Sequence, residues 1–196
     1  MLSRAWNNLR RRLQNPPGIA AGAEEPAPAP KPPRQRAPAR PVLPFEIRPP
    51  EADEMAALPE LFQQAINALA GADYSPEQCA AWAARAKEPD FVGGLEQGLT
   101  LVAQLEGRTV GFAQLRPEDT IAMLYVHPDA AGLGIATLLG QYLEDEARIA
   151  GATHLHTRAS LNARRFFEKM GLREQARESV HLNGVNLERI LMTKAL

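Results

Sequence analysis

The 196-residue chain has little cysteine, few aromatic residues and no long apolar segment. Its one cysteine, Cys79, excludes an internal disulfide and any cysteine-based zinc site. Because Cys79 falls in a helical pattern with no histidine beside it, we interpret it as a packing residue. No apolar run approaches the roughly 20 residues of a transmembrane helix, and no secretory signal is expected. These absences predict a soluble, cytoplasmic protein.

The chain also lacks the net positive charge that is typical of nucleic-acid-binding proteins. Residues 1–44 hold eight basic and two acidic residues, a formal charge of +6, whereas the whole chain carries −1. Residues 45–196 therefore carry −7. Because an acidic domain repels phosphate backbones, no nucleic-acid partner is expected.

The first 44 residues are predicted to form a tail that precedes the folded domain. Residues 1–14 carry Leu2, Trp6, Leu9 and Leu13 at helical spacing among arginines, which indicates a basic amphipathic helix with weak membrane or protein contacts, or a frayed terminus with an incidental pattern. Residues 15–44 are rich in proline and alanine, a composition that predicts a disordered linker.

A single folded domain is expected over residues 45–196. The apolar periods predict helices at 52–69, 75–87, 133–150 and 162–170. They predict strands at 45–48, 99–105, 109–115, 120–127, 154–157, 173–182 and 185–194. Tight turns are expected at Glu106-Gly107 and Asn183-Gly184. This order predicts an α+β (mixed α/β) fold, with a mainly antiparallel sheet of six to seven strands flanked by about four helices.

A glycine-rich turn joins a strand to a helix at residues 121–143. Such a turn points backbone N–H groups and the positive end of a helix dipole at one place, which suits a pyrophosphate. The turn is not a dinucleotide-binding fingerprint, because Thr137 stands where the third glycine belongs. It is not a Walker loop either, because no Gly-Lys-Ser/Thr follows.

Three motifs resemble those of the GNAT superfamily of N-acetyltransferases, over about residues 45–196. They are Leu-x-Val-x-Pro at Leu124–Pro128, Gly-x-Ala at Gly134–Ala136, and Phe-Phe-Glu-Lys-Met-Gly-Leu at Phe166–Leu172. The run Ala72–Gln78 followed by Trp82 further resembles a bacterial branch, the YafP-like proteins.

This resemblance implies an enzyme that uses acetyl-CoA as co-substrate and no metal, and that acetylates a primary amine of a small molecule or peptide by direct attack in a ternary complex. In the family, one strand splays from its neighbour and pairs with the pantetheine, and the turn receives the pyrophosphate. The implied cofactor contacts are Leu124, Tyr125, Val126, Ala131, Gly132, Leu133, Gly134, Ile135, Ala136, Thr137, Ser160 and Phe167.

The catalytic candidates are Tyr74, Tyr125, His127 and Ser160. Tyr74 is either a proton donor in the acceptor cleft or a packing residue. Tyr125 either reaches the reaction centre or packs against a helix. His127 is either a base or phosphate contact, or an exposed histidine before a proline, and Ser160 either donates to CoA, caps the next helix, or does both.

Four residues are candidates for binding the acceptor: Asp73, Tyr74, Arg158 and His181. Asp73 orients a cationic acceptor or caps a turn, whereas Arg158 and His181 shape a pocket for an anionic group. His154 and His156 share a strand face, but two histidines without a third ligand indicate no metal site.

The chain departs from the family pattern at several positions. Phe167 replaces a tyrosine that often protonates the thiolate, Ala131 opens the loop in place of glutamine or arginine, and Ala122 stands where YafP-like proteins often carry aspartate. These departures leave open a CoA-binding regulatory protein without catalysis. The basic tail leaves open an anchoring protein that the tail directs to an acidic membrane or partner. Whether the protein is a monomer or a homodimer also stays open.

Overall fold

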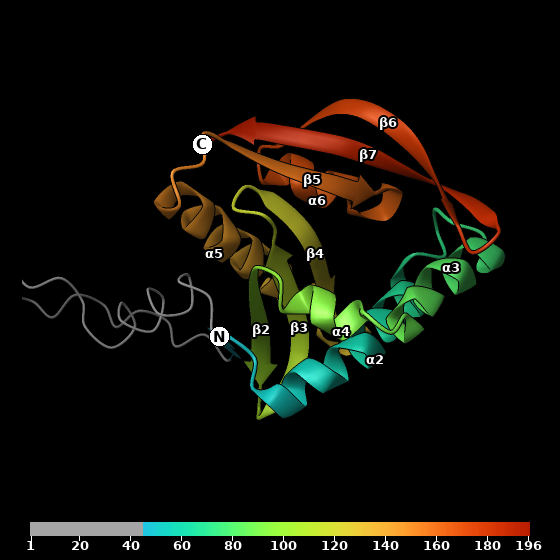
Figure 1. Cartoon of the computed structure of the whole chain (residues 1–196), viewed down its shortest axis with the longest axis horizontal. Coiled ribbons are helices and arrows are strands. Elements are labelled where there is room, and N and C mark those ends of the chain that lie inside the picture. The colour runs from blue at the N-terminus through green and yellow to red at the C-terminus, as the bar shows by residue number, and fades with distance from the viewer. Residues whose placement is uncertain (1–44) are drawn as a thin grey trace, which may run out of the picture. The chain divides into compact units, whose positions relative to one another are not determined.

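The structure, a computed structural model, describes residues 45–196, so the expected helix at 1–14 and linker at 15–44 lie outside the described residues. Seven strands form one sheet in the order β1-β2-β3-β4-β5-β7-β6 (Figure 1). The strands are β1 (Phe45–Arg48), β2 (Leu99–Leu105), β3 (Arg108–Leu115), β4 (Thr120–Val126), β5 (His154–Ser160), β6 (Arg173–Leu182) and β7 (Val185–Ala195). All neighbouring pairs are antiparallel except β4 and β5, which confirms the expected sheet.

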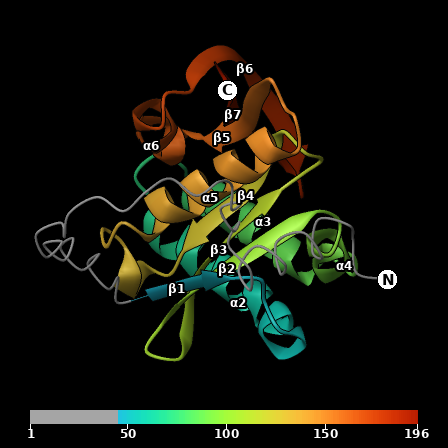
Figure 2. The ribbon, with the colours of Figure 1, turned by 90° about the vertical axis from the view of Figure 1, so that its left-hand side faces the viewer.

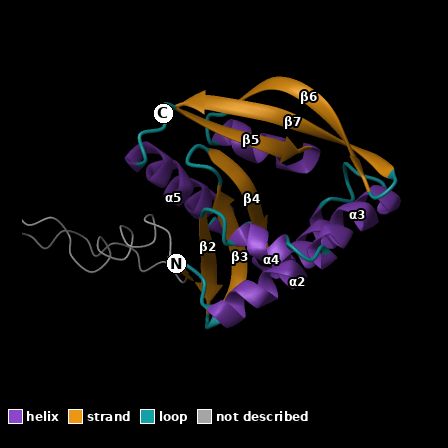
Figure 3. Ribbon diagram, in the orientation of Figure 1, coloured by secondary structure: helices purple, strands orange, loops and turns teal. Residues whose placement is uncertain are grey.

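Five α-helices accompany the sheet within residues 45–196 (Figure 3). They are α2 (Ala52–Leu69), α3 (Pro76–Ala83), α4 (Phe91–Leu95), α5 (Ile135–Ile149) and α6 (Arg164–Lys169). Three 3-10 turns are also present, η1 (Ala84–Lys87), η2 (Pro128–Ala130) and η3 (Leu161–Ala163). The sequence did not predict α4, because this five-residue helix contains two glycines, which disfavour helix formation.

Both predicted tight turns are present. Glu106 and Gly107 join β2 to β3 with φ angles of 51° and 77°. Asn183 and Gly184 join β6 to β7 with φ angles of 46° and 89°. Two successive positive φ angles match the right-handed twist of a hairpin, so these turns set the register of the flanking strands.

The central strands are covered on both faces. Helix α5 lies across β2, β3 and β4 on one face (Figure 2). Gly111 of β3 allows this close approach, because a side chain there would begin 3.1 Å from Ile135 Cγ2 and 3.1 Å from Tyr125 O. On the other face, α2 and α4 pack over a core that includes Phe62, Val102 and Phe112.

Strands β4 and β5 pair at one end only. Thr120 faces His156 and Ile121 faces Thr157, and within residues 45–196 no strand pairs with this edge of β4 beyond those two pairs. The register between β3 and β4 also shifts, so that Ala122 has no partner on β3. Such a bulge bends a strand locally. The bulge therefore lies where β4 turns away from β5 and leaves one strand edge open.

The expected capping of α3 is confirmed. The Ser75 side chain accepts a hydrogen bond from the Gln78 N–H, and the Gln78 side chain accepts one from the Ser75 N–H. Pro76 occupies the first turn, where its missing N–H costs nothing. This cap fixes the end of the loop that carries Tyr74.

Glu54 of α2 ties the helix to the edge of the sheet. It accepts two hydrogen bonds from Arg48, at 2.7 and 2.9 Å, and further ones from Gln104 and Thr109. Burial raises the pKa of the Glu54 carboxyl, but these hydrogen bonds outweigh burial and lower that pKa to about 2.

We therefore expect Glu54→Gln to lower the free energy of unfolding by about 2 kcal/mol at pH 7. A carboxyl whose pKa is depressed by folding stabilises the protein above its unfolded pKa and loses that contribution as the pH falls. The gap between the two proteins should then narrow between about pH 4.5 and pH 2. Urea unfolding at several pH values measures the difference in free energy of unfolding between the two proteins. A difference that does not change with pH would contradict the stabilising role of the Glu54 carboxylate.

Candidate functional site

The glycine-rich turn leaves backbone N–H groups open at the start of α5. Gly132 and Gly134 have φ angles of 82° and 84°, and no atom lies within 4 Å of where a side chain would begin at either residue. The first α5 hydrogen bond runs from the Leu138 N–H to the Gly134 carbonyl, so the amides of residues 135–137 have no acceptor within the helix. Residues 128–137 contain no lysine or arginine. Any anion here would be held by amides and the helix dipole.

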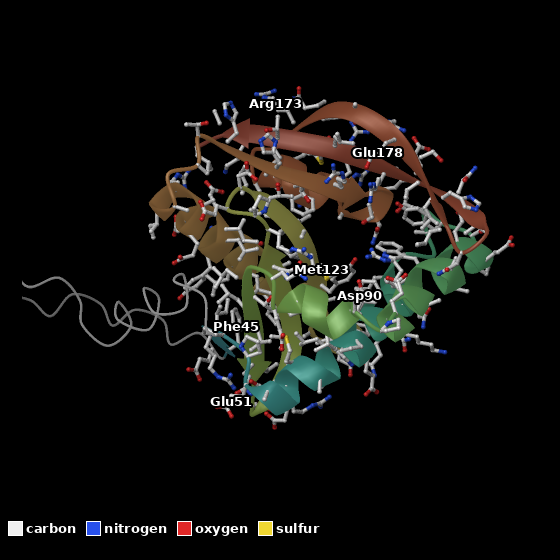
Figure 4. All side chains as sticks on the ribbon, viewed as in Figure 1. Phe45, Glu51, Asp90, Met123, Arg173 and Glu178 are labelled. Atoms are coloured by element: carbon white, nitrogen blue, oxygen red, sulfur yellow. The ribbon has the colours of Figure 1, made fainter. Side chains whose placement is uncertain are left out.

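Two adjoining cavities lie beside the open edge of β4. The smaller, of about 60 Å³, lies between the diverging strands and α6. Its lining includes Trp82, Ile121, Ala122, Met123, Leu124, Tyr125, Thr157, Arg158, Ala159, Ser160, Ala163 and Phe167. Figure 4 shows the side chains of this region, with Met123 marking β4 and Glu178 marking β6.

The larger cavity, of about 230 Å³, opens toward α3 and the β6–β7 hairpin. Its lining is Tyr74, Trp82, Arg85, Thr120, Ile121, Ala122, Tyr125, Arg158, Ser160, Val180, Leu182, Leu187, Glu188 and Arg189. Trp82, Tyr125, Arg158 and Ser160 are among the residues that line both cavities. These shared residues mark the junction at which two bound molecules would meet.

The Tyr74 hydroxyl holds three segments together at the larger cavity. It donates a 2.6 Å hydrogen bond to the Glu188 carbonyl of β7 and accepts a 3.0 Å bond from the Leu161 N–H. Burial raises the pKa of Tyr74, so the phenol stays protonated at neutral pH. The side chain lines the larger cavity, but its hydroxyl already donates a hydrogen bond to a main-chain carbonyl.

We expect Tyr74→Phe to lower the free energy of unfolding by about 2 kcal/mol, because it leaves two main-chain groups without their partner. Tyr142→Phe is the matched control, since the Tyr142 side chain is 37% exposed. Urea unfolding of both variants measures the difference. Equal stability of the two variants would show that these hydrogen bonds contribute nothing.

The Ser160 hydroxyl, by contrast, has no protein partner among the described residues. Ser160 ends β5 and precedes η3, but its side chain makes no capping hydrogen bond. It lines both cavities. Phe167, which belongs to α6, also lines the smaller cavity and is 4% exposed. Ser160 is thus a free hydroxyl at the junction.

Tyr125 both packs and lines the junction. Its ring is 4.7 Å from that of Phe62 and 5.5 Å from that of Phe112, measured between centroids. Burial raises the pKa of its hydroxyl well above the usual range. A phenol held this firmly neutral can donate a hydrogen bond but is no base at physiological pH.

Three of the catalytic and acceptor-binding candidates lie outside both cavities. Asp73 lines a separate surface hollow with Arg164 and Arg177, because Tyr74 beside it turns inward. The His127 Nδ1 accepts a 3.2 Å hydrogen bond from the Asp129 N–H, so this histidine caps η2. The His181 ring contacts the Asn186 side chain at 2.9 Å within its own hairpin. The structure does not bring these side chains to the junction.

Comparison with known protein families shows to which family this chain belongs. Residues 70–194 match the model of the acetyltransferase (GNAT) domain. The chain belongs to the GNAT family. A 140-residue stretch is 30% identical to the uncharacterized N-acetyltransferase YafP of Escherichia coli K12, covering 71% of this chain and 89% of YafP.

Solved GNAT structures share the fold. A GCN5-related N-acetyltransferase from Rhodopseudomonas palustris is 41% identical, with a TM-score of 0.75 over 77% of this chain and 95% of its own. The PaiA N-acetyltransferase of Thermoplasma acidophilum, solved with coenzyme A, is 17% identical, with a TM-score of 0.62 over 78% of this chain and 99% of its own. The family match supports N-acetyltransferase activity for this GNAT chain.

The sequence did not predict four side chains that line the larger cavity of this GNAT domain. They are Trp82, Arg85, Glu188 and Arg189. Arg85 lies on η1 and Glu188 and Arg189 on β7, about 100 residues apart in the chain. Only the sheet topology brings these elements together. Trp82 belongs to the run that resembles the YafP-like proteins, and its ring centroid lies 5.4 Å from that of Tyr74.

Residues 45–196 hold no group of three or more His, Cys, Asp or Glu side chains arranged to bind a metal ion. None of the helices in this part of the chain has the length and apolar character to span a membrane.

Proposed function

We propose that this chain is an acetyl-CoA-dependent N-acetyltransferase that acetylates a primary amine by direct attack in a ternary complex. The observation that carries the proposal is the continuity of the site. The open turn at the start of α5, the unpaired edge of β4 and the junction at Ser160 follow one another along the diverging strands. Acetyl-CoA and coenzyme A are present in two GNAT structures that share this fold, at 22% and 17% identity.

The residues present fit such a co-substrate. The space above Gly132 and Gly134 admits phosphate oxygens to the amides of residues 135–137. The edge of β4 from Ala122 to Val126 offers main-chain groups to an amide-bearing arm. Leu124 and Phe167 line the smaller cavity, where a thioester would lie.

The reaction joins the acceptor nitrogen to the acetyl carbon, breaks the carbon–sulfur bond, and moves one proton from the nitrogen to the sulfur, so a hydroxyl that protonates the sulfur regains its proton from the nitrogen. Ser160 is placed to donate that proton, because its hydroxyl has no protein partner and lies at the junction. Tyr74 and Tyr125 shape the wall against which the acceptor lies. An open β4 amide would polarise the carbonyl oxygen.

Phe167 supports a second candidate function, a CoA-binding protein without catalysis. A phenylalanine has no proton to give, and it lies in the wall of the smaller cavity.

Cytoplasmic location and contacts of residues 1–14 with an acidic membrane or partner stay proposals.

Titration calorimetry of the full chain with acetyl-CoA, followed by assay of thiol release over a panel of amines, tests both candidates. Micromolar binding, about −8 kcal/mol, together with amine-dependent thiol release supports the enzyme. Binding without release at any pH supports the second candidate. Absence of binding would refute both.

A further inference from the structure

The wall of the larger cavity carries more positive than negative charge. Arg85, Arg158 and Arg189 line it, and Glu188 is the one acid among its lining residues. The Glu188 carboxylate is itself paired with Arg177 at 3.1 Å. No unpaired acid in the lining is therefore available to bind a cationic group.

The three arginines are only partly neutralised. Arg158 and Arg189 share a single oxygen of Glu178, and each approaches it through Nε, in the case of Arg158 at 3.3 Å. Arg85 meets Glu88 at 3.8 Å. Neither Arg158 nor Arg189 forms another ion pair within the described residues, so their Nη groups remain available to a ligand. Guanidinium groups bind carboxylates through paired, charge-assisted hydrogen bonds.

The rest of the wall is apolar and aromatic. Val180, Leu182 and Leu187 come from the hairpin, and Trp82 and Tyr125 from the opposite side. The cavity of about 230 Å³ is smaller than the roughly 300–1,000 Å³ of sites for drug-sized ligands. An amino acid fits this scale better than a folded protein surface does.

We propose, resting on the proposed function, that the acceptor is a small amine that also carries a carboxylate and an apolar body, as an amino acid with an apolar side chain does. The Nη groups of Arg158, at the junction of the two cavities, hold the carboxylate, and the hairpin leucines hold the apolar body. The positive wall also disfavours the ammonium form of the acceptor, so its nitrogen is neutral and nucleophilic when it meets the acetyl group.

Three amines that share one apolar body test this assignment: phenylalanine, phenylalanine amide and phenethylamine. Thiol release by the full chain with acetyl-CoA gives kcat/KM for each, compared per concentration of neutral amine because the carboxylate alters the amine's own pKa. We expect kcat/KM for phenylalanine to exceed the values for the other two amines about 30-fold, which corresponds to one charge-assisted hydrogen bond.

The variant Arg158→Gln should raise KM for phenylalanine about 30-fold and should change KM for phenethylamine far less, because phenethylamine has no carboxylate to lose its partner. Arg108→Gln is the matched control, because Arg108 is exposed at the start of β3 and lines neither cavity. Arg108→Gln should leave KM for both amines unchanged.

The outcomes separate this inference from the function beneath it. If acetyl-CoA binds but phenylalanine releases no more thiol than its amide, the carboxylate assignment is wrong and the proposed function is untouched. If Arg158→Gln affects phenylalanine and phenethylamine alike, Arg158 does not read the carboxylate. If acetyl-CoA itself does not bind, both proposals fail.

Discussion

Gly134→Asp should weaken acetyl-CoA binding about 1,000-fold, from micromolar to millimolar, a loss of about 4 kcal/mol. The new carboxylate would stand beside the amides of residues 135–137, the groups that we propose receive the pyrophosphate. It would occupy those amides and repel the incoming phosphates. Aspartate is one of the few side chains that tolerate the φ of 84° found at Gly134, so folding should survive.

Gly151→Asp provides a closely matched control. Gly151 lies beyond the other end of α5, has a φ angle of 89°, and likewise has no atom within 4 Å of its would-be side chain. The same strain and the same added charge thus fall at a helix end with no open amides. Titration calorimetry should find acetyl-CoA affinity close to that of the wild type. Equal weakening by both variants would mean that the turn before α5 is not the phosphate site.

Much of this arrangement could be predicted from local sequence signals. The two-residue turn at Asn183-Gly184 sets the register of the last hairpin, and Ser75 with Gln78 marks the start of α3. The Gly132-Leu-Gly run marks the turn before α5, because only glycine takes those φ angles freely. Each of these features depends on residues within a few positions of one another.

The acceptor side could not be predicted in the same way. The larger cavity gathers residues from η1, β4, β5 and the β6–β7 hairpin, so its chemistry depends on contacts between distant segments. Asp73 and Tyr74 are neighbours in sequence, yet one lines a surface hollow and the other the cavity. The bulge at Ala122 depends on the register with β3, which no local pattern signals.

Because Phe167 has no proton to donate, another group must protonate the thiolate of the departing CoA. Besides Ser160, the hydroxyls of Tyr74, Thr120 and Tyr125 line the larger cavity, and that of Thr120 donates a hydrogen bond to the Asp119 carboxylate. The Thr157 hydroxyl, in the smaller cavity, donates to the Ile121 carbonyl. The Tyr74 hydroxyl donates a hydrogen bond to the Glu188 carbonyl, and the Tyr125 ring packs against Phe62 and Phe112. Ser160 alone combines a place at both cavities with a hydroxyl that has no protein partner in the described part of the chain.

Ser160→Ala should therefore lower kcat at least about 100-fold, within the range that general acid catalysis contributes. Because the Ser160 hydroxyl bonds no protein group, its removal should leave the free energy of unfolding unchanged and the affinity for acetyl-CoA nearly so. Ser160→Thr keeps a hydroxyl at the same position and should retain most of the activity. Thiol-release kinetics, calorimetry and urea unfolding of the three proteins measure these quantities.

The pairing with Tyr74→Phe distinguishes a chemical role from a structural one. If Tyr74 holds the site together and Ser160 supplies the proton, the tyrosine variant loses stability and the serine variant loses turnover alone. If Ser160→Ala retains full turnover while Tyr74→Phe loses it at conditions where both are folded, the proton comes from Tyr74. In that case the hydrogen bond to the Glu188 carbonyl must break when the acceptor binds.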